Sequence, residues 1–146
     1  MLTEENLLKL ALNIATKTHN GQTDKSGEPY IEHPIRVSKR CKSEDARIVA
    51  LLHDTIEDTD VTADYLLKKG FPSYLVDAVL AVTKLKDEDY MQYIQRASQN
   101  KISKEVKIAD LQDNMDITRL NYPMTQIDFD RLNKYLKAYK KLTNNI

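Results

Sequence analysis

Apolar residues recur along the chain at intervals of three and four residues, the spacing that places them on one face of an α-helix. The first such face follows Thr3, whose side chain suits a helix N-cap, and ends near Gly21. Residues 22–34 have the composition of a loop, and the proline at its end, Pro34, is suited to open a second helix. The apolar members of the first face are Leu7, Leu10, Ala11, Ile14 and Ala15.

The third predicted helix begins at Ser43 and leads directly into His53 and Asp54, so an apolar helix delivers two polar residues. No segment has the pattern of a convincing strand. The predicted fold is therefore all-α, a single compact domain over residues 1–146 with about seven to nine helices. The later helical patterns are marked by Thr62 and Gly70, Ser73 and Val82, Asp87 and Ala97, Ser103 and Asp110, and Phe129 and Leu142.

Composition excludes several classes of protein. The chain has 146 residues, with 22 Lys and Arg against 22 Asp and Glu, so its formal net charge is zero. This balance gives no general attraction to nucleic acid or to an anionic membrane, and no apolar run is long enough to span a bilayer. The single cysteine, Cys41, excludes an internal disulfide and is typical of a reducing compartment. We expect a cytoplasmic protein that handles any anionic ligand with local charges.

The most informative segment follows the apolar part of the third predicted helix, and it contains His53, Asp54, Glu57 and Asp58. If the helix continues, Glu57 stacks one turn beyond His53. Asp58 stacks likewise beyond Asp54, so all four side chains border one cavity. Leaving these groups uncompensated beside a core costs roughly several kcal/mol, because charges lose their hydration. A bound cation is the simplest compensation.

Imidazole and carboxylate ligands together suit Zn, Mn, Fe or Co better than Mg or Ca, which prefer oxygen alone. His33, at the end of the loop, and Asp110, which emerges from an apolar helix face, are candidates for the remaining ligands. Each residue also has an ordinary interpretation: His53 as a hydrogen-bonded histidine and Asp110 as a polar helix residue. The pair Glu57 and Asp58 can likewise be plain negative charge before a turn.

Several motifs occur together in a characteristic order, and together they are more specific than a lone His-Asp pair. They are His-Asn-Gly-Gln at 19–22, Lys-Ser-Gly-Glu-Pro-Tyr-Ile-Glu-His-Pro at 25–34, Leu-Leu-His-Asp-Thr-Ile-Glu-Asp-Thr at 51–59, Val-Thr-Lys-Leu at 82–85 and Val-Lys-Ile-Ala-Asp at 106–110. This order resembles the HD hydrolase domain of the RelA/SpoT alarmone family, especially its small stand-alone members, over nearly the whole chain. The resemblance implies the helical HD-domain bundle.

The resemblance also implies roles for particular residues. In that family one metal ion, usually Mn²⁺, is held by a set of residues that corresponds here to His33, His53, Asp54 and Asp110. The family's Glu-Asp pair, which helps to activate water and to move protons as pyrophosphate leaves the ribose 3′ oxygen of (p)ppGpp, corresponds to Glu57 and Asp58. The substrate contacts that the resemblance implies are Lys25, Ser26 and Asn114.

Two positions depart from the family pattern. Long family members have an arginine before the lysine of the loop, where it stacks on guanine, and this chain has Asp24. Where they have Asp-Arg-Leu-His-Asn-Met, residues 110–115 are Asp-Leu-Gln-Asp-Asn-Met. The metal chemistry is unaffected by these changes, whereas the preference for guanine is left open. We also expect no synthetase domain within the remaining length.

The sequence therefore predicts a metal-dependent (pyro)phosphohydrolase of a small phosphorylated nucleotide, with (p)ppGpp as the first candidate substrate. One alternative is hydrolysis of another nucleotide, such as ppApp, NADPH or a nucleoside monophosphate. A different alternative is a catalytically silent HD module that binds a nucleotide. The Glu57 and Asp58 pair favours an enzyme, because a pure binding module has no evident need for it.

Overall fold

The computed structural model describes residues 2–144; residue 1 and residues 145–146 of the predicted domain lie outside the described part. Nine α-helices and one 3₁₀-helix occur within residues 2–144, and no strand is formed there apart from an isolated bridge between Thr23 and Pro29. The predicted all-α fold is confirmed. The helices are α1 (Glu4–Thr18), α2 (Glu32–Arg40), α3 (Glu44–Leu52), α4 (Thr55–Asp58), α5 (Ala63–Lys69), α6 (Ser73–Ala81), α7 (Tyr90–Ser98), α8 (Lys101–Asn114), η1 (Ile117–Arg119) and α9 (Gln126–Leu142).

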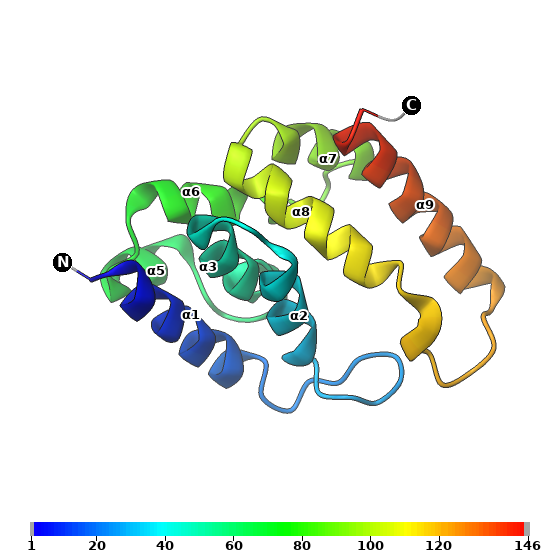
Figure 1. Ribbon diagram of the computed structural model, residues 1–146, viewed down its shortest axis with the longest axis horizontal. Coiled ribbons are helices and arrows are strands. Elements are labelled where there is room, and N and C mark those ends of the chain that lie inside the picture. The colour runs from blue at the N-terminus through cyan, green and yellow to red at the C-terminus, as the bar shows by residue number, and fades with distance from the viewer. Residues whose placement is uncertain (1, 145–146) are drawn as a thin grey trace.

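Helix α3 lies in the middle of the main core. It packs against α1, α2, α6 and α8, which surround it in Figure 1. Its apolar side chains are buried around nearly the whole helix, as expected for a helix that is hydrophobic all round. The fully buried residues of α3 are Ala46, Ile48, Val49, Ala50 and Leu52.

A second, smaller apolar cluster joins α7, α8 and α9. Its buried members are Tyr93, Ile94, Leu111, Ala138 and Leu142. Helix α8 contributes to both clusters, with α2 and α3 on one side and α9 on the other (Figure 1). Polar residues of α8 can therefore meet side chains from both halves of the bundle. Within residues 2–144, no helix combines the length and the apolar character needed to cross a membrane.

Several helix boundaries differ from the expectation: α7 begins at Tyr90 rather than near Asp87, and α8 begins at Lys101 rather than at Ser103. Two further differences lie at the candidate site. Helix α2 begins at Glu32, two residues before Pro34, so His33 belongs to its first turn, where a proline is tolerated because the N–H groups have no helical partner. Helix α3 ends at Leu52 rather than continuing through His53. The reason is local: the carbonyl of Ala50 accepts from Nδ1 of His53 at 2.6 Å, and that of Leu52 accepts from the Thr55 hydroxyl at 2.7 Å.

Candidate metal centre

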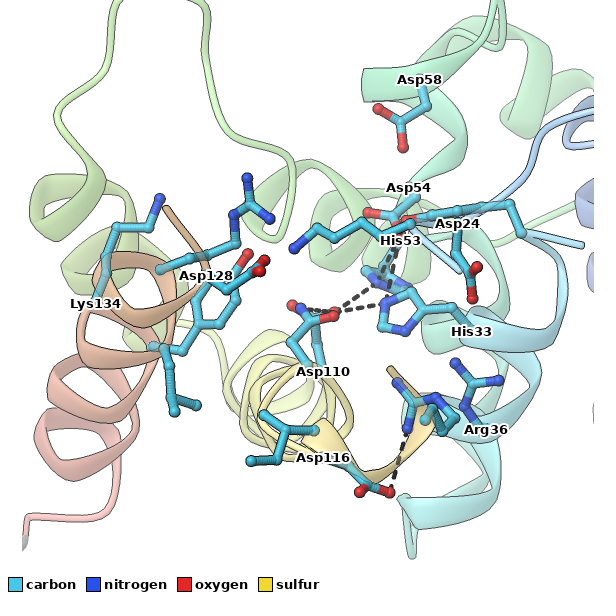
Figure 2. Close-up of a pocket in the computed structure, with 18 of the residues that line it drawn as sticks. Asp24, His33, Arg36, His53, Asp54, Asp58, Asp110, Asp116, Asp128 and Lys134 are labelled. Carbon is cyan, nitrogen blue, oxygen red and sulfur yellow. Dashed lines mark hydrogen bonds and ion pairs between the residues drawn. The ribbon is translucent and has the colours of Figure 1, made fainter. Parts of the chain in front are cut away.

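Side chains from three parts of the chain meet at one point between α2, α3 and α8. His33 comes from α2, His53 and Asp54 from the turn between α3 and α4, and Asp110 from α8. Oδ1 of Asp110 lies 2.8 Å from Nε2 of His33 and 3.2 Å from Nε2 of His53. Nε2 of His53 also lies 3.1 Å from Oδ2 of Asp54 (Figure 2). The structure thus brings together all four residues that the sequence suggested as metal ligands.

Three of these residues have the geometry of a shared cation site. His33, His53 and Asp54 each present one ligand atom, and these atoms lie within 4.8 Å of one another. Asp110 adds an oxygen close to both imidazoles. The four residues together are called the ligand cluster below. Two imidazole nitrogens and two carboxylates form a donor set that fits a divalent transition metal.

Both imidazole rings are held by hydrogen bonds at Nδ1, the nitrogen that points away from the ligand cluster. Nδ1 of His53 lies 2.6 Å from the Ala50 carbonyl oxygen, and Nδ1 of His33 lies 2.7 Å from Oδ2 of Asp113. Both partners are acceptors, so each Nδ1 carries the proton and donates. Nε2 of each ring therefore faces the cavity, which is the arrangement of a histidine ready to bind a metal.

The imidazoles and carboxylates of the ligand cluster favour one another's charged forms. Burial acts to lower the pKa of His33, but hydrogen bonds to Asp110 and Asp113 outweigh it and raise that pKa. Burial also opposes charge on His53, and the charge of Asp54 and the hydrogen bond to Asp110 raise its pKa well above the usual value. For Asp54, burial acts to raise the pKa, and the neighbouring charge of His53 lowers it to about 2. A metal ion at this position competes with protonation of Nε2, because a metal-binding imidazole must be neutral.

Two residues that sequence analysis did not single out complete the surroundings of the cluster. Lys107 is buried one turn before Asp110, and its Nζ donates to Oδ2 of Asp110 at 2.8 Å. The hydroxyl of Tyr30 donates to Oδ2 of Asp54 at 2.5 Å. Each carboxylate is thus held from outside the cluster. The spacing of Lys107 from Asp110 is a signal that the sequence carries, whereas the contact of Tyr30 depends on the tertiary fold.

Comparison with known proteins agrees with this geometry. The family profile described as "HD domain" matches residues 11–113. The chain belongs to the HD-domain family. Two curated relatives are the guanosine-3′,5′-bis(diphosphate) 3′-pyrophosphohydrolase of Borreliella burgdorferi and the GTP pyrophosphokinase of Myxococcus xanthus.

The curated matches cover part of the HD domain. The first is 43% identical over 81 residues, which are 53% of this chain and 12% of that protein, and the second is 45% identical over 83 residues, 54% of this chain and 11% of that protein. The chain therefore spans little more than a tenth of the length of either relative. The two names describe opposite reactions, so similarity in this region does not by itself identify a reaction.

A solved structure covers more of the HD domain. It is described as "A metazoan ortholog of SpoT hydrolyzes ppGpp and plays a role in starvation responses". The TM-score is 0.77 at 27% identity, over 93% of this chain and 84% of that one. Together with the curated relatives, this match confirms the resemblance to the HD domains of the RelA/SpoT family.

The Glu-Asp pair of the HD domain lies in α4, a single helical turn separate from α3, and both residues line the same cavity as the cluster. Oε1 of Glu57 accepts a hydrogen bond from the backbone N–H of Lys84 at 3.0 Å. Burial and the charges of Asp54 and Glu57 raise the pKa of Asp58 to about 6. Figure 2 shows Asp58 directed toward Asp54 and His53. A carboxyl group with such a pKa can both accept and release a proton near neutral pH.

The three predicted substrate contacts line the cavity, which has a volume of about 580 Å³. Nδ2 of Asn114 donates to Oδ1 of Asp110 at 3.2 Å, beside the ligand cluster. The hydroxyl of Ser26 is engaged by the chain near η1, since it donates to the Arg119 carbonyl and accepts from the backbone N–H of Asn121, each at 3.3 Å. Lys25 lies on the same loop as Ser26.

Asp24 stabilises the loop that carries Lys25 and Ser26. Its Oδ1 accepts from the backbone N–H groups of Ser26 at 2.8 Å and Glu28 at 3.0 Å. One carboxylate oxygen of Asp24 is thus used to close the turn. This local hydrogen-bonding role is typical of aspartate in loops.

The cavity lining also includes Lys84, in the segment after α6, and Arg131 and Lys134 on α9, and we call these three cations the cationic wall. Within residues 2–144, none of the three has a carboxylate at ion-pair distance; Lys134 instead lies over the Tyr90 ring at 4.5 Å. Figure 2 shows Lys134 on α9, across the cavity from His33 and His53. Lys84 lies within the motif at 82–85, whereas the contribution of Arg131 and Lys134 was not predicted, because it depends on how α9 packs against α8.

Proposed function

We propose that this HD domain is a metal-dependent phosphohydrolase that removes pyrophosphate from the ribose 3′ oxygen of (p)ppGpp. The observation that carries the proposal is the placement of the ligand cluster and the Glu57–Asp58 pair in one cavity with unpaired cations. The printed names of the Borreliella protein and of the metazoan structure support the choice of reaction.

We further propose that the metal is Mn²⁺, held by His33, His53, Asp54 and Asp110. The mixed imidazole and carboxylate donors fit Mn²⁺ and also admit Fe²⁺ or Zn²⁺. When bound, such an ion lowers the pKa of water and screens phosphate charge. Tyr30 and Lys107 keep Asp54 and Asp110 oriented toward the ion by holding one oxygen of each carboxylate.

The remaining residues act on substrate and protons. Lys84, Arg131 and Lys134 offer unpaired positive charge to phosphate groups, and Lys25, Ser26 and Asn114 contact the nucleotide. Glu57 and Asp58 accept a proton from the attacking water and return one to the 3′ oxygen as pyrophosphate leaves. The raised pKa of Asp58, about 6, suits this exchange.

A second candidate substrate class follows from Asp24. Its carboxylate closes the loop at a position where guanine-stacking arginine occurs in long family members, so the loop offers no guanidinium plane there. Another nucleotide with a ribose-linked phosphate, such as ppApp or NADPH, or a nucleoside monophosphate, is therefore the alternative substrate. The alternative outside enzymes is an HD module that binds such a nucleotide without hydrolysing it.

The deciding experiment is a substrate panel. Metal-stripped protein, reloaded with Mn²⁺, is incubated with ppGpp, pppGpp, ppApp, NADPH and nucleoside monophosphates, and released phosphate and pyrophosphate are measured. We expect pyrophosphate from ppGpp, and none before Mn²⁺ is restored. Release only from another nucleotide assigns that substrate to the same metal chemistry. Silence on all of them, with Mn²⁺ demonstrably bound, refutes the hydrolase and favours the binding module.

A further inference from the structure

We propose that Asp113 is a positioning residue that fixes the ring of His33 for metal binding, and that Arg36 and Arg119 hold Asp113 in place. The inference rests on the proposed metal site. It concerns one of the positions at which this chain departs from the pattern of long family members, which have histidine there.

Two carboxylates of α8 contact the imidazole ring of His33. Asp110 and Asp113 lie one turn apart on α8, so their side chains share a face. Oδ1 of Asp110 lies 2.8 Å from Nε2 of His33, and Oδ2 of Asp113 lies 2.7 Å from Nδ1 of the same ring. The two carboxylates hold the ring from both sides, and only the Nε2 side opens to the cavity.

Asp113 is kept charged inside the protein by several arginines. Its side chain has no exposed surface, and a buried carboxylate is unfavourable unless it is paired. Arg36, one turn after His33 on α2, donates through Nε to both oxygens at 2.9 and 3.2 Å. Arg119 approaches both oxygens at 3.5 Å and donates to the Asp113 backbone carbonyl at 3.0 Å. Nε of Arg40 lies 3.7 Å away.

The contrast with His53 shows what the carboxylate adds. Nδ1 of His53 donates to a neutral backbone carbonyl, whereas Nδ1 of His33 donates to a charged oxygen. A carboxylate behind a metal-binding histidine fixes the tautomer and makes the ring a stronger donor to the metal. Because the carbonyl of Arg119 also accepts from the Ser26 hydroxyl, the same contacts link His33 to the loop that lines the cavity.

The test is a measurement of Mn²⁺ affinity for the whole chain, by titration followed with electron paramagnetic resonance. Asp113→Ala is expected to weaken Mn²⁺ binding by about 10- to 100-fold. Asp113→Asn, whose side-chain oxygen still accepts from Nδ1, is expected to lose less than the alanine variant. The control is Asp116→Asn, which removes a charge 3.3 Å from the same Arg119 without contact to His33, and which is expected to leave the affinity unchanged.

The outcomes separate this inference from the proposed function. A folded Asp113→Ala protein with unchanged affinity overturns the positioning role and leaves the metal site intact. Equal losses in the alanine and asparagine variants also overturn it, since the loss of the negative charge beside the arginines, and not the loss of the oxygen that holds Nδ1, then accounts for the effect. A wild-type protein that does not bind Mn²⁺ refutes the proposed metal site itself.

A second measurement needs no variant. In ¹⁵N-labelled wild-type protein loaded with diamagnetic Zn²⁺, long-range ¹H–¹⁵N spectra report which ring nitrogen of His33 carries the proton. We expect the proton on Nδ1, in slow exchange with solvent because Asp113 is buried. A proton on Nε2 overturns the inference even if Asp113→Ala fails to fold.

Discussion

The ligand cluster and the cationic wall line one cavity but differ in how their charges are paired. Each member of the ligand cluster has a partner of opposite charge or a hydrogen-bond partner within the fold, including Lys107 on Asp110 and Tyr30 on Asp54. By contrast, the three cations of the cationic wall have no carboxylate at ion-pair distance within residues 2–144. The side chains of the cluster are thus held in place by the fold, whereas the wall offers positive charge that an anionic ligand can pair with.

The largest expected effect comes from the Glu57–Asp58 pair, which lines the same cavity as the ligand cluster and the cationic wall. Asp58→Asn and Glu57→Gln each remove a proton-transfer group and keep the shape of the side chain, so we expect kcat to fall by about 10²- to 10⁴-fold. Mn²⁺ affinity, measured in the same preparations, is expected to stay within about twofold because neither residue belongs to the donor set. Unchanged turnover in both variants refutes the catalytic role of the pair.

A smaller effect is expected from the cationic wall, and it concerns KM rather than metal binding. Arg131→Ala and Lys134→Ala each remove one charge-assisted contact to phosphate, which corresponds to an increase in KM of about tenfold. The pKa of Lys134 is lowered by burial and by the charge of Arg131, so its replacement also relieves repulsion within the wall. Thermal stability is therefore expected to hold or to rise slightly.

The control for this pair is Lys137→Ala, because Lys137 is exposed on α9 and does not line the cavity. We expect this variant to keep the KM of the wild type. An equal increase in KM for Lys137→Ala indicates a general effect of charge rather than contacts made by the wall. A loss of Mn²⁺ affinity in the Arg131 or Lys134 variant contradicts the separation of the ligand cluster from the cationic wall.

The same contrast explains how far the sequence predicted the site. His53 and Asp54 were predictable because an apolar helix leads into them. His33, at the end of a loop, and Asp110, on an apolar helix face, were candidates from their positions, and the order of motifs implied the same four ligands. The end of α3 before His53 was not predictable, because it depends on side-chain hydrogen bonds to the last carbonyls of that helix. Its consequence is limited, since the single turn of α4 still places Asp58 at the cavity.

Residues behind the ligands and on the cationic wall were harder to predict. Lys107 and Arg36 lie one turn from a predicted ligand, and this spacing is visible in the sequence once the ligand is known. Asp113 was visible only as a departure from a motif. Arg131 and Lys134 lie on an amphipathic helix whose polar face looks like any solvated surface, and only the packing of α9 on α8 turns it toward the cavity.

The segment that carries Lys84 is held by one ion pair and several carbonyl contacts. Arg96 on α7 donates to Oε1 and Oε2 of Glu88, each at 2.9 Å, and to the carbonyls of Leu80 at 3.0 Å and Thr83 at 2.7 Å. Hydrogen bonding to Arg96 lowers the pKa of Glu88 to about 2. This pair therefore supports the position of Lys84 without contact to the ligand cluster.

The smallest expected effect is that of Glu88→Gln on stability. Since the folded-state pKa of Glu88 lies below its ordinary value of 4.5, the stabilisation is complete above about pH 4.5 and is lost as pH falls toward 2. We expect Tm at pH 7 to fall by about 2 °C, because the pair is partly exposed, and the difference from wild type to shrink below pH 4.5. Glu5→Gln, which removes a highly exposed pair with Lys9, is the control and is expected to change Tm less. A difference that instead grows as pH falls contradicts the assignment, because it requires Glu88 to stabilise the fold in its protonated form.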